Sequence, residues 1–160
     1  MLTWAVKEQN GPVAIRYPRG GDGTYADAMW HPENRVVTHR QGTDGAIVTY
    51  GKLVNNALAA ADILAEQGIR ISVIRLTGLA PVDFTGLENA LMGIKNVIFA
   101  EEVSVGIYEA VASALVENHR FSRLDLGQEY VTHGSVDKLY FQYGLDAVSM
   151  AEKMKVVLGK

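Results

Sequence analysis

The feature that most constrains the fold is an alternation, from residue 45 onward, between short apolar runs and helix-length amphipathic segments. We expect strands at "AIVTYG" (46–51), "IRISVIRL" (69–76), "NVIFA" (96–100) and "SRLDLG" (122–127). Strands separated by helix-length connections pair in parallel through crossover helices, and both faces of such a sheet are covered. The pattern therefore predicts a doubly wound α/β fold.

The intervening segments show helical periodicity and recognisable end signals. Asp83, Ser135 and Asp146 stand where helix N-caps belong, and Gly68 stands where a C-cap belongs. The inward faces of these helices are predicted to comprise Leu53, Ala57, Ala60 or Ala61, Leu64, Leu87, Ala90, Leu91, Ile94, Ile107, Val111, Ala114, Leu115, Met150, Met154, Val157 and Leu158.

The first forty residues do not share this rhythm. "LTWAVKEQ" is compatible with a helix, "PVAIRYP" (12–18) with a strand, and "RVVTHR" with an extra edge strand. We therefore expect residues 1–20 to be the tail of a preceding domain, residues 21–35 a linker, and residues 36–160 a complete domain. That domain is predicted to be a three-layer α/β/α sandwich, whose mostly parallel sheet of about five strands carries an antiparallel strand at one edge.

Composition excludes several classes of function. The chain has no cysteine, which removes disulfides, thiolate zinc sites and cysteine nucleophiles. Its 15 basic and 18 acidic residues give a net charge of −3, which is not the footprint of a protein that binds nucleic acid or an anionic membrane. No apolar stretch approaches the roughly 20 residues of a membrane span, and the start lacks the features of a signal peptide. We expect a cytoplasmic protein.

A Gly-Asp-Gly at residues 21–23 invites comparison with thiamin diphosphate sites. In those sites an aspartate and an asparagine about thirty residues later hold a magnesium ion, and Asn55 and Asn56 follow here at a similar distance. Magnesium ligands must converge rigidly on one octahedron. Asn55 and Asn56 fall inside a predicted helix, on its solvated side, and Asp22 falls in the linker. We therefore predict that this chain binds neither the cofactor nor a metal through these residues.

Two arginines flank the end of the strand predicted at 12–18. Arg19 follows Pro18 and precedes two glycines, which would let a ligand approach closely. A guanidinium in such a place forms a fork for a phosphate or a carboxylate. The alternative is a solvated arginine at a strand end, and spacing alone leaves both readings open for Arg16 and Arg19.

No complete catalytic constellation emerges from the remaining candidates. Glu101 and Glu102 follow an apolar strand, at the end where α/β sites form, and are either an acid–base pair or helix-capping or interface charges. The histidines, at positions 31, 39, 119 and 133, show no metal-ligand spacing. His133, just before a predicted helix, is expected to make a structural hydrogen bond. We predict no catalytic residue in this chain.

Collinear segments of the chain resemble the deoxyxylulose-phosphate synthases, thiamin diphosphate enzymes of the transketolase family. "GPVAIRYPRG" is similar to the segment that joins their second and third domains. "IVTYGKLVNNALAAADILAEQGIRISVIRL", "LAPVD" and "VIFAEE" look like the first strands and acidic corner of the C-terminal domain. "HGSVDKLYFQYGLDAVSMA" looks like the synthases' C-terminal ending, so that the resemblance covers essentially the whole chain.

The resemblance implies a C-terminal portion of an enzyme that condenses pyruvate with glyceraldehyde 3-phosphate. The full enzyme would use thiamin diphosphate and magnesium, held by the missing N-terminal and pyrimidine-binding domains, and would form a homodimer. Residues 1–20 would be the tail of the pyrimidine-binding domain. Arg19 would hold the phosphate of the aldehyde substrate. The isolated chain would be inactive and would bind no cofactor.

One loop departs from the synthase pattern. After the acidic corner the synthases carry a glycine-rich run, whereas "EEVSVGIYEAV" is shorter and keeps only Gly106. Two other assignments stay open: the C-terminal part of a transketolase or of a 2-oxo acid dehydrogenase β subunit, and a stand-alone binding module with the same fold.

Overall fold

The computed structural model describes residues 2–15, 23, 33–103, 105–128 and 130–160. In chain order the elements are α1 (Leu2–Lys7), β1 (Val36–Arg40), β2 (Gly45–Tyr50), α2 (Leu53–Glu66), β3 (Ile71–Leu76), α3 (Phe84–Ala90), β4 (Asn96–Ala100), α4 (Tyr108–Leu115), β5 (Arg120–Leu124), α5 (Val136–Gln142) and α6 (Ala147–Leu158).

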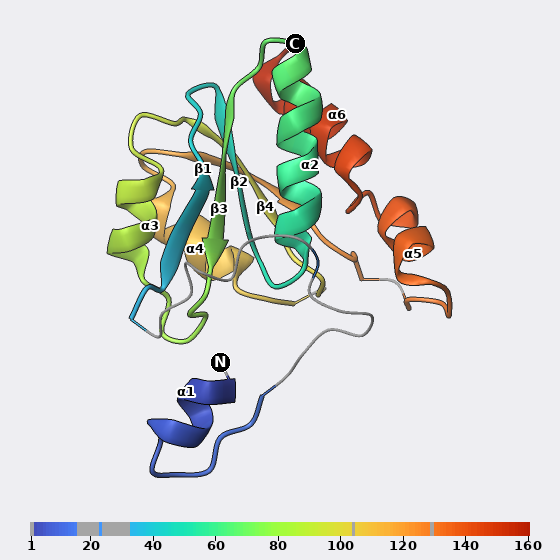
Figure 1. The fold of residues 1–160 in the computed structure, drawn as a ribbon. Coiled ribbons are helices and arrows are strands. Elements are labelled where there is room, and N and C mark those ends of the chain that lie inside the picture. The colour runs from blue at the N-terminus through green and yellow to red at the C-terminus, as the bar shows by residue number, and fades with distance from the viewer. Residues whose placement is uncertain (1, 16–22, 24–32, 104, 129) are drawn as a thin grey trace.

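The five strands form one sheet in the order β1-β3-β2-β4-β5 (Figure 1). β2 pairs in parallel with both β3 and β4, and β4 pairs in parallel with β5. β1 runs antiparallel to β3, with Val36 opposite Leu76 and Val37 opposite Arg75. The predicted parallel sheet with one antiparallel edge strand is confirmed.

Helices cover both faces of the sheet, so that strand residues alternate between two apolar clusters. On one face Ile47, Val73 and Ile98 pack with α2 and α6. On the other face Val48, Ile74 and Phe99 pack with α3 and α4. Because both faces are covered, runs such as "VIFA" need no polar alternation. The predicted three-layer sandwich is confirmed.

The inner face of the long helix α2 is apolar, and three of its six buried side chains are alanines. Leu53, Val54, Ala57, Ala60, Ala61 and Leu64 are buried along its inner face. Past the end of the helix Gly68 takes a φ of 76°, and the amide of Ile69 donates to the carbonyl of Leu64 at 3.0 Å. The turn that glycine was predicted to provide is therefore present.

Three local predictions need correction. No strand forms over residues 12–15, where Pro12 and Val13 are exposed, and residues 16–18 lie outside the described residues. Ala114, which was predicted to face inward, is exposed. The buried residues of α4 are Val111 and Leu115. β5 begins at Arg120, two residues earlier than predicted, since Asn96 of β4 pairs with Arg120.

Candidate functional site

The strand order creates a topological switch point at the carboxyl ends of β2 and β4. From the central strand β2, the chain crosses to β3 on one side and then returns past β2 to β4 on the other. Ligand sites of open α/β sheets form where connections diverge in this way. Tyr50 ends β2, and Glu101 and Glu102 follow β4 directly. This edge of the sheet is therefore the candidate site.

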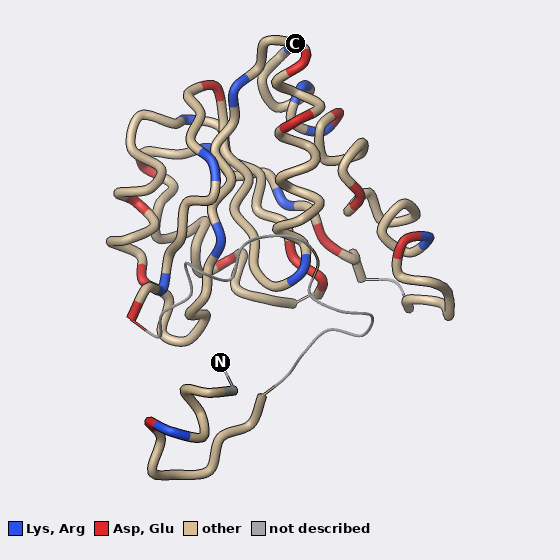
Figure 2. The backbone as a smooth tube through the Cα atoms, viewed as in Figure 1, with Lys and Arg blue, Asp and Glu red and all other residues tan. Residues whose placement is uncertain are grey.

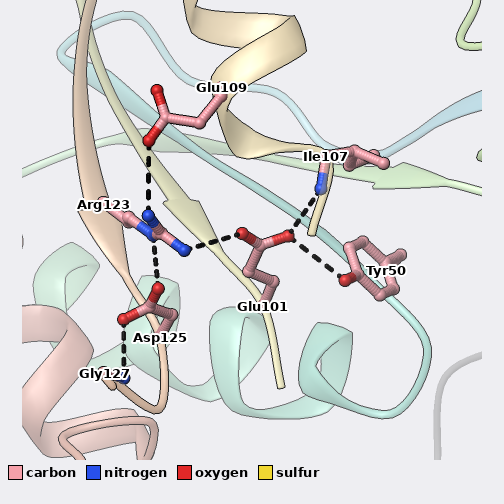
Figure 3. Close-up of polar contacts among 7 residues, drawn as sticks. All are labelled: Tyr50, Glu101, Ile107, Glu109, Arg123, Asp125 and Gly127. Atoms are coloured by element: carbon pink, nitrogen blue, oxygen red, sulfur yellow. Dashed lines mark hydrogen bonds and ion pairs between the residues drawn. The ribbon is translucent and has the colours of Figure 1, made fainter. Parts of the chain in front are cut away.

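Glu101 is fully buried at this switch point. Its Oε2 accepts a hydrogen bond from the backbone amide of Ile107 at 3.1 Å and one from the Tyr50 hydroxyl at 3.2 Å (Figure 3). The Arg123 guanidinium lies 3.8 Å from the other carboxylate oxygen. A buried carboxylate requires such partners, because an unpaired charge away from water is costly.

Arg123 links this carboxylate to two further acidic residues. Its guanidinium pairs with Glu109 of α4 at 3.3 Å and with Asp125, which follows β5 (Figure 3). The same group lies 5.3 Å from the centre of the Tyr108 ring, within cation–π range. Asp125 in turn accepts a hydrogen bond from the amide of Gly127 at 2.9 Å. One arginine thus connects the loops after β4 and β5.

Glu102 points to the opposite face of the sheet from Glu101. Its carboxylate accepts a hydrogen bond from the hydroxyl of Tyr140 on α5. Tyr140 belongs to the apolar cluster under α2 and α6, whereas Tyr50 packs against the cluster under α3 and α4. The two consecutive glutamates therefore tie both layers of the sandwich to the end of β4. The carboxyl-edge network, as we call it, comprises the Ile107 and Gly127 amides and the side chains of Tyr50, Glu101, Glu102, Glu109, Arg123, Asp125 and Tyr140.

The electrostatics of the network keep its phenols protonated. Burial, the charge of Glu101 and the hydrogen bond to it raise the pKa of Tyr50 above its ordinary value. Burial and the hydrogen bond to Glu102 likewise raise the pKa of Tyr140. Both tyrosines therefore act as hydrogen-bond donors to carboxylates over the whole physiological pH range.

This arrangement supports a structural role for Glu101 rather than acid–base chemistry. A general acid or base must reach a substrate proton, and Glu101 has no exposed surface. Its carboxylate instead satisfies the amide of Ile107, the N-cap residue of α4. Of the two sequence-based interpretations, helix capping is therefore the one that the geometry supports. Glu102 is exposed, and its carboxylate accepts the hydrogen bond from Tyr140 of the same network.

The structure describes only some of the other candidate residues from the sequence. Arg16, Arg19, Asp22 and His31 lie outside the described residues. His119 is buried, and its Nδ1 donates to the carbonyl of Ile94 at 2.7 Å, a structural role that the sequence did not indicate. His39 is half-buried, and burial and the charge of Arg75 lower its pKa. His133 is exposed and makes no hydrogen bond within the described part of the chain.

Asn55 and Asn56 do not converge on one point. The Asn55 amide donates to the carbonyl of Lys52 at 3.0 Å, within its own helix turn. The Asn56 amide donates to the carbonyl of Leu145 at 2.8 Å, before α6. Both residues are half-buried rather than solvated: Gly23 lies against the Asn55 side chain, and Asn56 reaches the segment before α6. These two side chains therefore do not fit a shared magnesium site, and within the described ranges no three metal-ligating side chains cluster.

Sequence reasoning missed most of the carboxyl-edge network. Tyr50 lies next to the end of a predicted strand, and that position was the available signal. Arg123 and Asp125 fall inside the strand predicted at 122–127 and lie near a strand end only because the observed β5 ends at Leu124. Only the strand order places them together, because β4 lies between β2 and β5. Tyr140 carried no such signal, since it lies within α5.

This fold and edge define a class of protein domain. Residues 34–150 match the transketolase C-terminal domain family, and the chain belongs to that family. None of the described helices is long and apolar enough to cross a lipid bilayer.

Full-length relatives give a narrower assignment. The chain is 34% identical to a 1-deoxy-D-xylulose-5-phosphate synthase of Chlorobium phaeovibrioides over 98% of its length. It is 31% identical to the synthase of Lysinibacillus sphaericus over 99% of its length and 35% identical to that of Thermomicrobium roseum over 96%. In each case the chain spans 26% of the relative, so that about three quarters of each relative has no counterpart here.

Solved structures agree with the fold. A chain described as "Split gene transketolase, inactive beta4 tetramer" superposes with a TM-score of 0.72 and 28% identity, over 86% of this chain and 46% of that one. A mutant transketolase from Pichia stipitis superposes with a TM-score of 0.59 over 79% of this chain and 18% of that one. At 18% identity this second likeness supports the fold alone.

Proposed function

We propose that this chain is the C-terminal part of a thiamin diphosphate-dependent 1-deoxy-D-xylulose-5-phosphate synthase. Such an enzyme joins pyruvate, with loss of carbon dioxide, to glyceraldehyde 3-phosphate, at the head of isoprenoid and thiamin synthesis. The observation that carries the proposal is likeness to proteins of that name over 96–99% of the chain. The transketolase and 2-oxo acid dehydrogenase alternatives are not favoured by these relatives.

In this proposal the chain contributes a scaffold and one substrate contact. The described part of the chain holds its charged side chains at the switch point in mutual hydrogen bonds and ion pairs, as expected of a structural domain. Thiamin diphosphate and magnesium would be held by the remaining three quarters of the enzyme, which would be a cytoplasmic homodimer. The proposed boundaries are residues 1–20 for the tail of the preceding domain, 21–35 for the linker and 36–160 for this domain.

A chimera tests the proposed activity. Residues 1–160 would replace the matched C-terminal quarter of the Chlorobium phaeovibrioides synthase, and formation of 1-deoxy-D-xylulose 5-phosphate would be measured. We expect turnover with pyruvate and glyceraldehyde 3-phosphate. A folded chimera that binds the cofactor but forms no product would contradict the proposal.

The same chimera tests Arg19 as the phosphate ligand. Loss of a charge-assisted hydrogen bond costs about 1.5–3 kcal/mol, so Arg19→Ala should lower kcat/KM for glyceraldehyde 3-phosphate by about 10- to 100-fold. The apparent KM for pyruvate should stay within about twofold. Arg16→Ala is the matched control, because Arg16 lies in the same motif without an assigned ligand. Equal losses in both variants would remove the special role of Arg19.

A further inference from the structure

Two adjoining hollows lie at the amino edge of the sheet, at the upper end of the view in Figure 1. The first, of about 380 Å³, is lined by the turn between β1 and β2, the start of β3 and the end of α3. The second, of about 490 Å³, is lined by the end of α3, the turn after it and the residues that precede β5. Asn89, Met92 and Ile94 line both hollows, which are therefore neighbours. Their volumes suit a small organic ligand.

The first hollow has a rigid wall, because the turn between β1 and β2 is tied to the start of β3. The amides of Thr43 and Asp44 donate to the carbonyl of Arg70 at 3.0 and 2.9 Å. The Arg70 amide donates in return to the Asp44 carboxylate at 2.7 Å. A Cβ at Gly42 would lie 2.4 Å from the backbone of Ile71, so that glycine is required where the turn crosses β3. This wall is therefore in place before a ligand binds, which lowers the cost of binding.

These bonds fix the backbone of Arg70 and leave its guanidinium available. Among the residues that the structure describes, this guanidinium makes neither an ion pair nor a hydrogen bond, and it is the one charged group that lines the first hollow. The other polar side chains of the lining are uncharged hydroxyls and amides: Thr38, Gln41, Thr43, Ser72 and Asn89. A guanidinium beside hydroxyl and amide donors forms a fork for a phosphate group.

The second hollow offers hydrogen-bond acceptors. Glu88 and Asn118 line it, and the Asn118 amide donates to the Glu88 carboxylate at 2.8 Å. This bond leaves the second carboxylate oxygen and the Asn118 side-chain carbonyl to accept from a ligand. Lys95 lies on the same lining and offsets the charge of Glu88. Between the two hollows the Met92 side chain is 75% exposed, and its thioether provides an adaptable apolar contact for the organic part of a ligand.

The charge around the hollows limits the size of the anion that fits. Charged positions of both signs are interspersed at this upper end of the molecule (Figure 2). Arg70, Lys95 and Arg120 are exposed there, and so are Glu88 and Glu117. Because the charges are mixed, this edge does not favour a polyanion such as nucleic acid. A single phosphate group held by one guanidinium is the anion that suits it.

We propose that the two hollows form one binding site for a small phosphate monoester that carries hydroxyl or amino groups. The phosphate group pairs with the Arg70 guanidinium in the first hollow. The organic part passes over Met92 and donates hydrogen bonds to Glu88 and Asn118 in the second hollow. This inference goes beyond the proposed function and does not depend on it, because it rests on side chains at the amino edge of this chain alone.

An NMR titration of the isotope-labelled 160-residue chain with adenosine monophosphate tests this site. The probe has a phosphate group for the first hollow, and hydroxyl and amino donors for the second. We expect saturable shifts of the amide signals of residues 41–44, 70–72 and 88–95. Adenosine, which lacks the phosphate group, should bind at least about tenfold more weakly, because it forfeits the charge-assisted hydrogen bonds to Arg70. Inorganic phosphate should shift the signals of the first hollow only.

Three variants locate the phosphate group. Arg70→Gln should weaken the binding of adenosine monophosphate by at least about tenfold. Asn89→Asp, which places a carboxylate on the lining of both hollows, should also weaken it. Arg120→Gln is the matched control, because Arg120 is exposed at the same edge and lines neither hollow. This control should bind within about twofold of the original chain, and the amide spectra verify that each variant is folded.

Several outcomes overturn the inference. It falls if adenosine monophosphate at millimolar concentration causes no saturable shifts, or if the shifts map to the carboxyl edge of the sheet. Equal binding of adenosine and its monophosphate would remove the phosphate group from recognition. Equal losses in Arg70→Gln and Arg120→Gln would show that net charge alone attracts the probe. None of these measurements involves turnover, so their failure leaves the result of the chimera unaffected.

Discussion

Gly106 is the residue whose replacement most directly tests the buried carboxylate. A Cβ at this position would lie 2.0 Å from Oε2 of Glu101 and 2.7 Å from Cγ2 of Val103. A glutamate at the surface would swing aside, but Glu101 is fully buried and bonded to Ile107 and Tyr50. Gly106→Ala should therefore lower the free energy of unfolding by about 1–3 kcal/mol in urea titrations.

Gly11→Ala is the matched control for that substitution. Nothing lies within 4 Å of a Cβ built on Gly11, and neither glycine has a positive φ. The control should change the free energy of unfolding by less than about 0.5 kcal/mol. Equal stabilities of the Gly106 and Gly11 variants would show that Glu101 is not packed against this glycine.

Tyr50 and Tyr140 of the carboxyl-edge network should make the free energy of unfolding fall at alkaline pH. Because the pKa values of Tyr50 and Tyr140 are raised in the folded chain, the unfolded chain releases these protons first, near pH 10. The stabilisation is fully present below about pH 10 and declines as pH rises further. Thermal melts between about pH 8 and about pH 11.5 should show this decline.

A pair of tyrosine variants assigns the alkaline effect. Tyr50→Phe should flatten the decline, whereas Tyr130→Phe should leave it unchanged, because Tyr130 is 93% exposed. An unaltered alkaline profile in Tyr50→Phe would contradict the hydrogen bond to Glu101.

At the scale of elements, the two C-terminal helices begin in different ways. Asp146 accepts hydrogen bonds from the amides of Val148 and Ser149 at 3.0 and 3.1 Å, so it caps α6. Ser135 occupies the same place before α5 but makes no side-chain capping bond, which corrects the prediction from sequence. Asp146→Ala should cost about 1 kcal/mol, and Ser135→Ala should cost less than about 0.5 kcal/mol.

Differential scanning calorimetry compares these two variants directly. Asp146→Ala should lower the Tm by about 2–4 °C and Ser135→Ala by less than about 2 °C, because a chain of this size shifts by about 2–4 °C for each kcal/mol. A larger loss from Ser135→Ala would mean that its hydroxyl caps α5 in solution.

Helices and strands were predictable from the sequence where the apolar pattern extended over many residues and where capping residues marked the ends. Apolar spacing and Gly68 located α2, and the dense apolar run located β4. The short segment at 12–15 failed because a strand requires a partner, and its apolar residues are no evidence of one. The candidate site was harder to predict from the sequence. Strand ends indicated Glu101 and Glu102, but only the spatial order of the strands brings Tyr50 and Arg123 to them. A sequence pattern contains no information on that order until the crossovers are known.

At the scale of the whole molecule, the sandwich should fold without its first 33 residues. Among the residues that the structure describes, the members of both apolar clusters all lie at or after Val36. A chain of residues 34–160 should therefore unfold cooperatively, with a free energy of unfolding within about 1 kcal/mol of that of the full chain. Circular dichroism in urea, with two-dimensional NMR spectra, measures this.

The control for that truncation removes the opposite end of the chain. Residues 1–144 lack α6 and with it the fully buried Met150 and Met154. Loss of these side chains exposes the inner face of α2, so this chain should not fold cooperatively. If residues 34–160 were unfolded and residues 1–144 were folded, the assignment of the core would be wrong.

The direction of α6 has a practical consequence. This helix ends with Gly159 in the left-handed conformation, and the chain terminates at Lys160, at the upper end of the view in Figure 1. The parallel strands point toward the lower end, where the antiparallel β1 begins. A fluorophore or affinity handle attached at Lys160 therefore lies at the end of the sandwich opposite the loops that follow β4 and β5, and the molecule can be immobilised there with those loops facing the solution.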